Sequence, residues 1–178
     1  NSETDFVAKN KDFQSFVKTV AELALANEGE MEAVIGSGYP GTDRKVSEQL
    51  AHNITIIGEN MNIRRMSSLS VTEGVISGYM HNAECAGLGK IGVLVGLESK
   101  AKKEFLESLA KQIGMHVAAT NPQSLTVDDL DPELVEREKS VQIEKARESG
   151  KPDNIIEKMI DGRMRKYYEE VVLLNQVF

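Results

Sequence analysis

Ile91-Gly-Val-Leu-Val-Gly-Leu97 decides the fold class, because this run is apolar enough to be a central β-strand. Residues 71–79 carry β-branched and aromatic side chains, and they predict a strand before it. The link at residues 81–89 is rich in turn-forming residues, so the two strands are expected to form an antiparallel hairpin with a longish loop. A shorter strand is predicted at residues 62–66.

Amphipathic helices are predicted before these strands. Residues 12–27 place apolar side chains at i, i+3 and i+4 spacing, and Asn10 offers an N-cap. A stretch rich in glycine and proline follows and is expected to be a loop. A second helix is predicted from Thr42 or Asp43 to Gly58.

A third helix is predicted after the strands, with Ser99 as its cap. It runs into residues 115–119 and stops at Asn121, because a residue before proline avoids the helical region. Its apolar face is expected to contain Ala101, Phe105, Leu106, Leu109 and Ile113.

The last third of the chain is dense in charges of both signs. Pro132 suits the first position of a helix capped by Asp131, and a second helix is predicted near Asn154 after a turn at residues 150–153. Helices joined by so short a turn must be antiparallel neighbours, which predicts a coiled-coil-like hairpin. Its seam is expected to contain Leu134, Glu138 and Val141, then Ile156, Ile160, Met164, Tyr167 and Val171.

Together these elements predict an α+β protein with antiparallel sheet subdomains, packed helices and a projecting helical hairpin. Residues 1–98 are expected to form a first α+β core subdomain. Residues 99–125 and 170–178 would belong to a second, incomplete one, and residues 126–169 would form the hairpin.

Composition narrows the function classes. The 178 residues are 40% hydrophobic and 28% charged, as in ordinary globular proteins. The net charge of −7 argues against nucleic acid as a direct partner. No apolar run is long enough to cross a bilayer, which argues against a membrane partner. The chain begins at Asn1 rather than Met, so it is expected to be a piece of a longer protein.

The candidate metal ligands and nucleophiles lack a recognisable spacing. His52, His81, His116 and Cys85 form no His-x-x-x-His or Cys-x-x-Cys pattern, so neither a metal site nor a cofactor is expected. Cys85 and His81 could formally form a nucleophilic pair, but no third residue to orient it is evident. His116 lies near a predicted helix end, where a histidine interacts favourably with the helix dipole.

The first ten residues contain a short turn between two potential caps. Thr4 or Asp5 can begin it, and it carries Phe6 and Val7. An exposed ring beside a carboxylate suits insertion into a partner protein. The alternative is a hydrophobic staple, in which Phe6 and Val7 pack on the next helix.

The string Glu3-Thr-Asp-Phe-Val-Ala-Lys9 resembles the signature of the elongation factor Ts family. Further blocks of that family appear in the same order along nearly the whole chain. They are Ile57-Gly-Glu-Asn-Met-Asn-Ile-Arg-Arg65, Lys90-Ile-Gly-Val-Leu-Val95, Met115-His-Val-Ala-Ala119, Ser149-Gly-Lys-Pro152 and Gly162-Arg-Met164.

The resemblance implies a guanine-nucleotide exchange factor that promotes GDP release from the GTPase elongation factor Tu, without covalent chemistry of its own. By resemblance, Phe6 is a wedge between helices of the GTPase and Asp5 disturbs the magnesium shell. Thr4 and Val7 shape the turn.

The resemblance implies a second contact at Met115, His116 and Val117, which would face the phosphate-binding loop of the GTPase. It also implies a bacterial cytoplasmic protein, although an organelle matrix fits equally well. Family members usually carry a preceding helical domain and a strand after the C-terminal end, so this chain is expected to be a fragment lacking both. The alternative from another class is a non-catalytic adaptor that acts through the helical hairpin.

Overall fold

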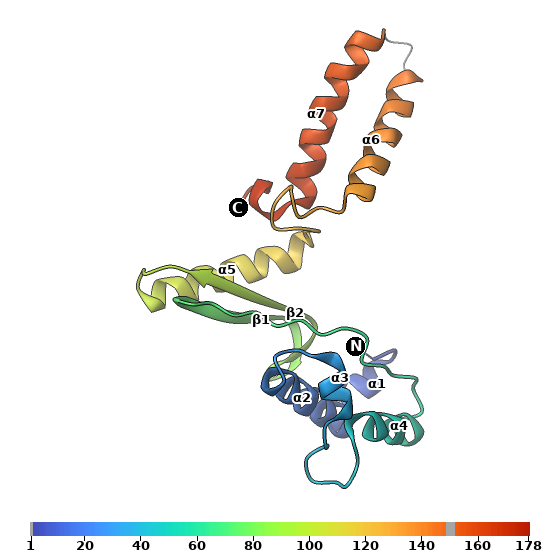
Figure 1. Ribbon diagram of the computed structural model, residues 1–178, viewed down its shortest axis with the longest axis vertical. Coiled ribbons are helices and arrows are strands. Elements are labelled where there is room, and N and C mark those ends of the chain that lie inside the picture. The colour runs from blue at the N-terminus through green and yellow to red at the C-terminus, as the bar shows by residue number, and fades with distance from the viewer. Residues whose placement is uncertain (1, 149–151) are drawn as a thin grey trace. The chain divides into compact units, whose positions relative to one another are not determined.

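The computed structural model describes residues 2–148 and 152–178, and it confirms the α+β class. The chain divides into two compact units, of which the first ends at Lys111 and the second begins at Gln112. Each is considered by itself below. The described elements, shown in Figure 1, are α1 (Asp5–Ala8), α2 (Lys11–Ala26), α3 (Met31–Gly36), α4 (Val46–Ile57), β1 (Gly74–Cys85), β2 (Leu88–Glu98), α5 (Lys103–Thr120), α6 (Pro132–Arg147), α7 (Asp153–Val171) and the 3-10 helix η1 (Leu173–Asn175).

The predicted helix at residues 12–27 is confirmed as α2. The Asn10 side chain accepts hydrogen bonds from the backbone N–H groups of Asp12 and Phe13, at 2.8 and 3.1 Å. On the buried face, the ring of Phe16 stacks on that of Tyr39, with 5.8 Å between the ring centroids. The cap fixes the start of α2, and the stacked pair joins α2 to the loop that follows α3.

The stretch between α2 and α4 differs from the prediction. It contains the short helix α3 before the loop, and Val34 of α3 is fully buried. The predicted start of the next helix at Thr42 or Asp43 is wrong, because both residues lie in a turn closed by Tyr39 N–H donating to the Arg44 carbonyl at 2.8 Å.

Helix α4 begins instead where a carboxylate can cap it. The Glu48 carboxylate accepts a hydrogen bond from the backbone N–H of Lys45 at 2.8 Å, and Val46 is fully buried. The predicted stop at Gly58 is confirmed, with this residue in the left-handed conformation at φ 81°. That end of α4 leads directly to Glu59.

The sheet of the described residues is a two-stranded antiparallel hairpin of β1 and β2. The strands are longer than predicted, and the longish loop is wrong: only residues 86–87 link them, with a register irregularity between Ala83 and Cys85. The predicted strand at residues 62–66 is also wrong. That segment has no strand partner, and Ile63 instead lies with Val17 and Val20 of α2 along one groove.

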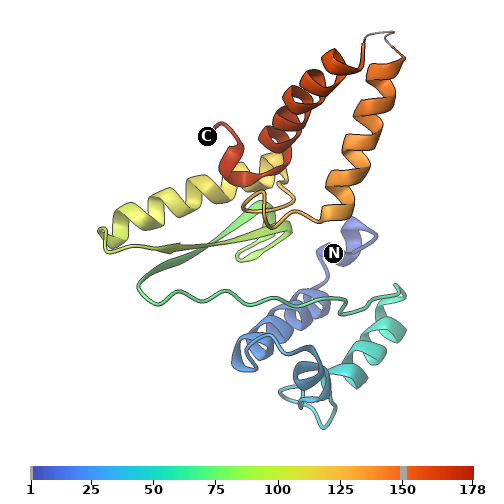
Figure 2. The ribbon, with the colours of Figure 1, turned by 45° about the horizontal axis from the view of Figure 1, so that its top comes forward.

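Helix α5 starts later than predicted. The Ser99 hydroxyl accepts from the Ala101 N–H at 3.2 Å, but this turn precedes the helix, so Ser99 is not the helix cap. In the first unit, Leu106 and Ala110 form the buried face of α5, whereas the predicted Phe105 is 62% exposed. This part of α5 runs along the β hairpin (Figure 2).

The second unit contains the predicted antiparallel helical hairpin of α6 and α7 (Figures 1 and 2). Asp131 caps α6 by accepting from the Glu133 N–H at 2.9 Å, and Pro132 is the first helical residue, as predicted. The turn at residues 150–153 and the block at 149–152 fall largely outside the described residues. The buried cluster between the helices contains Ala146, Ile156, Ile160 and Met164, flanked by Val135, Ile143, Tyr167 and Tyr168.

This cluster confirms the predicted seam of α7 at Ile156, Ile160, Met164 and Tyr167 but not at Val171, and it does not confirm the predicted seam of α6. Leu134 is exposed, and its neighbour Val135 faces α7 instead. Arg163 of α7 fixes the register by donating to the Gln142 side-chain oxygen at 3.1 Å and to its carbonyl at 3.3 Å. The periodicity of a sequence as polar as α6 cannot reveal a shift of one residue.

Candidate functional site

The N-terminal turn is a capped helical turn, as predicted. Thr4 is the N-cap of α1, and its Oγ1 accepts a hydrogen bond from the Val7 N–H at 3.4 Å. Asp5 is therefore the first helical residue rather than the cap. The single turn fixes the backbone that carries Phe6.

The side chains of this turn divide into an exposed ring and a buried base. Phe6 is 89% exposed, whereas Val7 is 8% and Ala8 9% exposed. The hydrophobic staple is therefore wrong for Phe6, because this ring does not pack on α2. Val7 and Ala8 anchor the turn and leave the aromatic ring in solvent.

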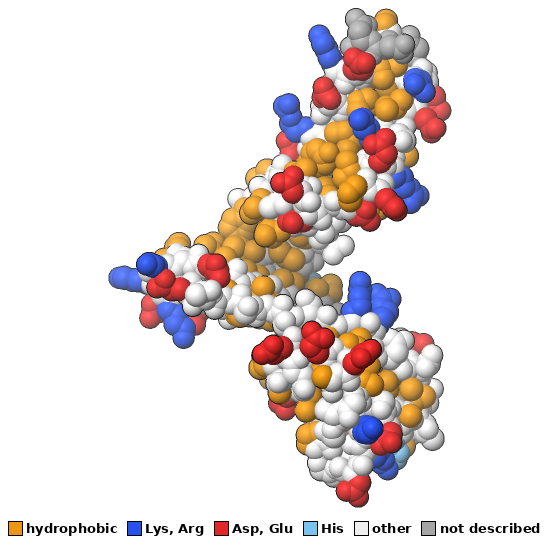
Figure 3. All heavy atoms as spheres, in the orientation of Figure 1, with side chains coloured by type: hydrophobic (Ala, Val, Ile, Leu, Met, Phe, Trp, Pro, Cys, Tyr) orange, Lys and Arg blue, Asp and Glu red, His pale blue; other side chains and the backbone are white. Residues whose placement is uncertain are grey.

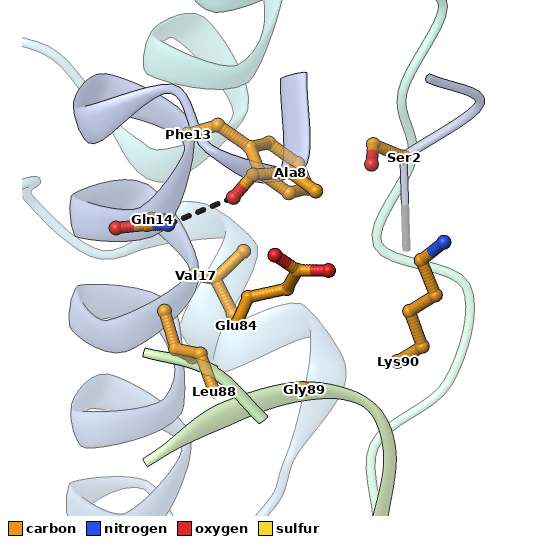
Figure 4. A pocket seen from close by; sticks show the side chains of 9 residues that line it. All are labelled: Ser2, Ala8, Phe13, Gln14, Val17, Glu84, Leu88, Gly89 and Lys90. Carbon is orange, nitrogen blue, oxygen red and sulfur yellow. Dashed lines mark hydrogen bonds between the residues drawn. The ribbon is translucent and has the colours of Figure 1, made fainter. Parts of the chain in front are cut away.

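The buried base of the turn lies against α2 and the end of the β hairpin. Gln14 of α2 donates to the Ala8 carbonyl at 2.8 Å (Figure 4). Ala8 also lines a small cavity of about 70 Å³ with Phe13, Val17 and Leu88 (Figure 4). The neighbouring helix α2 and the distant β hairpin thus support the turn.

Glu59, just after α4, binds the chain that enters the turn. Its Oε1 accepts from the Thr4 hydroxyl at 2.6 Å and from the Thr4 N–H at 3.2 Å, while Oε2 accepts from the Glu3 N–H at 2.9 Å. Chiefly because of the Thr4 hydroxyl bond, and also because of the two backbone bonds, the pKa of Glu59 is lowered. The carboxylate therefore stays ionised as an acceptor over a wide pH range.

Lys90 of β2 holds the acidic residue of the turn. Its Nζ donates to Oδ1 of Asp5 at 2.8 Å. This hydrogen bond, followed by the attraction of the two charges, lowers the pKa of Asp5 and raises that of Lys90. Asp5 is thereby presented as a carboxylate on the solvent-exposed side of the turn.

The second predicted group lies in the last turns of α5, in the second unit. The Met115 side chain is exposed, whereas His116 and Val117 are half-buried. His116 Nε2 lies 2.8 Å from Oε1 of Gln176, and its ring meets the Phe178 ring edge-on, with 5.5 Å between centroids.

Gln176 organises this group through both ends of its amide. Its Oε1 also accepts from the Thr120 hydroxyl at 2.9 Å, and its Nε2 donates to the Glu170 carbonyl at 2.7 Å. The orientation of His116 is therefore coupled to α7. The sequence indicated only that His116 lies near a helix end, and it did not indicate Gln176.

Within residues 2–148 and 152–178, no group of three or more His, Cys, Asp or Glu residues is arranged to hold a metal ion. His81 instead pairs with Tyr79 on β1, where the phenol oxygen lies 3.2 Å from Nδ1. Cys85 is a half-buried thiol at the end of the same strand. Over the same residues, no helix has the length and apolar character needed to cross a membrane.

Comparison with known families gives one clear match. Residues 3–178 match the family described as "Elongation factor TS". The chain belongs to the elongation factor Ts family. Its relatives include proteins named "Elongation factor Ts" from Parvibaculum lavamentivorans and Bartonella bacilliformis, which are 53% and 54% identical over all 178 residues. The chain spans 58% of the length of each of these relatives.

Two residues of the candidate site were missed from the sequence. Glu59 and Lys90 each lie in a block that resembles elongation factor Ts, at residues 57–65 and 90–95, but neither residue was assigned a role from the sequence. Their contacts to the turn join positions 55 and 85 residues apart. Their charge and their place in these blocks were the only signals for them.

Proposed function

We propose that this chain promotes release of GDP from elongation factor Tu, with the Thr4–Val7 turn as its wedge. The observation that carries the proposal is the exposure of Phe6 on a turn whose following two residues are buried. A large apolar side chain held in water on a rigid support suits insertion into a pocket of a partner. The bacterial cytoplasm is the proposed place of action.

Exchange of this kind requires no covalent chemistry by the chain. An exchange factor must bind the nucleotide-free GTPase more tightly than the GDP-bound form, because only differential affinity shifts the equilibrium. Insertion of Phe6 would separate helices of the GTPase domain. Asp5, on the same turn, would bring a negative charge towards the magnesium ion that bridges the GTPase and its nucleotide.

The second contact is proposed at Met115, His116 and Val117, against the phosphate-binding loop of the GTPase. The exposed Met115 side chain offers an adaptable apolar surface. His116 is oriented by Gln176, so its ring is held in one direction before a partner binds. A partner that moves the phosphate loop would weaken the hold on GDP from this side as well.

Release of a fluorescent GDP analogue from elongation factor Tu tests the wedge. Catalytic amounts of the 178-residue chain should accelerate release, and Phe6→Ala and Asp5→Ala should each slow it by about tenfold or more. Lys11→Ala, which alters an exposed side chain outside the turn, serves as the control. Equal rates for the native chain and Phe6→Ala would remove the wedge from the mechanism.

The contact on the phosphate side has its own test. His116→Ala should slow release by several-fold, because the oriented ring is lost. Gln176→Ala should also slow release, because it removes the side-chain oxygen that His116 and the Thr120 hydroxyl both contact. An unchanged rate in both variants would limit the exchange site to the N-terminal turn.

An adaptor function remains the second candidate, because the hairpin offers a groove of its own. Apolar atoms lie in a strip between charged side chains on α6 and α7 (Figure 3), and Val135, Ile160 and Met164 line a groove there. In this case Tyr168→Ala, which removes part of the groove lining, would abolish partner binding while Phe6→Ala would not. The exchange assay with both variants separates the two functions.

A further inference from the structure

Glu59 makes three hydrogen bonds to the segment that leads into α1, and each has a separate structural effect. The bonds from the Glu3 and Thr4 N–H groups fix the backbone direction at the entrance of the turn. The bond from the Thr4 hydroxyl fixes the side chain that also caps α1. One carboxylate therefore sets both the position and the capping of the turn.

The Glu59 side chain is itself supported from α4. Gly58 ends this helix in the left-handed conformation, and the Gly58 N–H donates to the Ile54 carbonyl at 2.9 Å. Asn53, one turn earlier, is buried and accepts from the Gln49 side chain at 2.9 Å. The carboxylate thus extends from a helix end that is fixed by hydrogen bonds on its buried side.

We propose that Glu59 is a positioning residue for nucleotide exchange, which holds the Thr4–Val7 turn so that Phe6 stands in solvent ready for insertion. This inference rests on the proposed function. Val7 and Ala8 bury the far side of the turn, but burial alone is non-directional and leaves the direction of the entering chain free. The bonds to Glu59 supply that direction. Holding the ring in its binding geometry lowers the entropy lost when the partner binds.

The first test measures the turn without any GTPase. Backbone ¹⁵N relaxation of the 178-residue chain should show residues 4–7 as rigid as α2 in the native protein. In Glu59→Ala these residues should become mobile on the nanosecond timescale while α2 and α4 stay rigid. A turn that remains rigid in Glu59→Ala overturns the proposal, whatever the exchange assay shows.

The second test is a double-mutant cycle in the GDP-release assay. Glu59→Ala should slow release by about tenfold, and Glu59→Gln, which keeps one acceptor oxygen, should give an intermediate rate. In the Phe6→Ala background, Glu59→Ala should have no further effect, because Glu59 acts through the ring. Glu22→Ala, an exposed glutamate on α2, is the matched charge control.

The outcomes distinguish the positioning role from the proposed function. If Glu59→Ala slows GDP release equally in the native and Phe6→Ala backgrounds, Glu59 acts independently of the ring. That result overturns the positioning role. No GDP release by the native chain would reject the exchange function for this chain, and the relaxation measurement would still decide whether Glu59 holds the turn.

Discussion

Lys90 Nζ lies 2.8 Å from Oδ1 of Asp5, so the second strand of the β hairpin holds the acid that immediately precedes the exposed Phe6. Both side chains are more than half exposed. An ion pair so open to solvent adds little to stability and is weakened by salt. The ion pair instead fixes the direction of the Asp5 carboxylate, which lies next to the Phe6 ring in sequence.

Lys90→Met should raise the pKa of Asp5 towards its ordinary value of 3.8, because the hydrogen bond and charge of Lys90 are its main lowering influences. Carboxyl ¹³C NMR titration measures this shift. Asp129 is the internal control, because the Thr126 hydroxyl and N–H lower its pKa without any lysine. Movement of Asp129 in the variant would indicate a general change of structure instead.

The same pair predicts how stability depends on pH. The folded pKa of Asp5 is lowered, so its contribution is complete above 3.8 and is lost as the pH falls through the folded value. The folded pKa of Lys90 is raised, so its contribution is complete below 10.5 and is lost as the pH rises through the folded value. Unfolding midpoints of the native and Lys90→Met chains should therefore differ only slightly at pH 7, because the pair is exposed, and converge at both extremes.

Phe6→Ala and Val7→Ala should separate function from stability. Phe6 is 89% exposed, so its removal should change the free energy of unfolding by less than about 0.5 kcal/mol. Val7 is buried, and losing its two methyl groups should cost about 1–2 kcal/mol. Urea unfolding measures both variants. A large loss in Phe6→Ala would mean that the ring packs within the protein.

The hairpin core predicts an asymmetry along α7. Ile160 is 5% exposed and belongs to the cluster with Ala146 and Met164, so Ile160→Ala should destabilise the hairpin by about 2–4 kcal/mol. Ile155 on the same helix is 44% exposed. Ile155→Ala should therefore destabilise the hairpin by well under half as much as Ile160→Ala. Thermal unfolding followed by circular dichroism compares the two. Equal losses would contradict the packing of α6 on α7.

The first residue of β1 has no room for a side chain unless the two strands shift. A Cβ at Gly74 would fall on the carbonyl oxygen of Leu97 in β2, whereas one at Gly78 would make ordinary contact with Leu94 at 3.7 Å. Gly74→Ala should therefore cost about 1–3 kcal/mol, and Gly78→Ala much less. Amide hydrogen exchange of β1 measures the difference. Unchanged protection in Gly74→Ala would contradict the close approach of the two strands.

Local signals predicted the capped elements well. Asn10 before α2, Gly58 after α4 and Asp131 before α6 all lie where their side chains or backbone preferences indicated, because capping depends on only a few neighbouring residues. The short turn of α1 was predicted for the same reason. The exposure of Phe6 could not be predicted from composition, because a ring packed as a hydrophobic staple and an exposed ring require the same residue types.

Features that depend on contacts between distant parts of the chain could not be predicted from the sequence. Residues 62–66 have strand-like composition, but no neighbouring strand supplies hydrogen bonds, so the segment lies along α2 instead. Phe105 and Leu106 are equally apolar, yet only Leu106 is buried. The contact of Glu59 could not be predicted, because its partner Thr4 lies 55 residues earlier and no periodicity indicates such a pairing.

The bond between Thr4 and Glu59 also has a consequence for the order of folding. It closes a loop of 55 residues that contains α2, α3 and α4. Closing so long a loop costs chain entropy that must be offset by contacts made elsewhere, so we expect the helices of this unit to assemble before the bond forms. We therefore expect the exposed Phe6 ring to take its final direction only after α4 has placed Glu59 against Thr4.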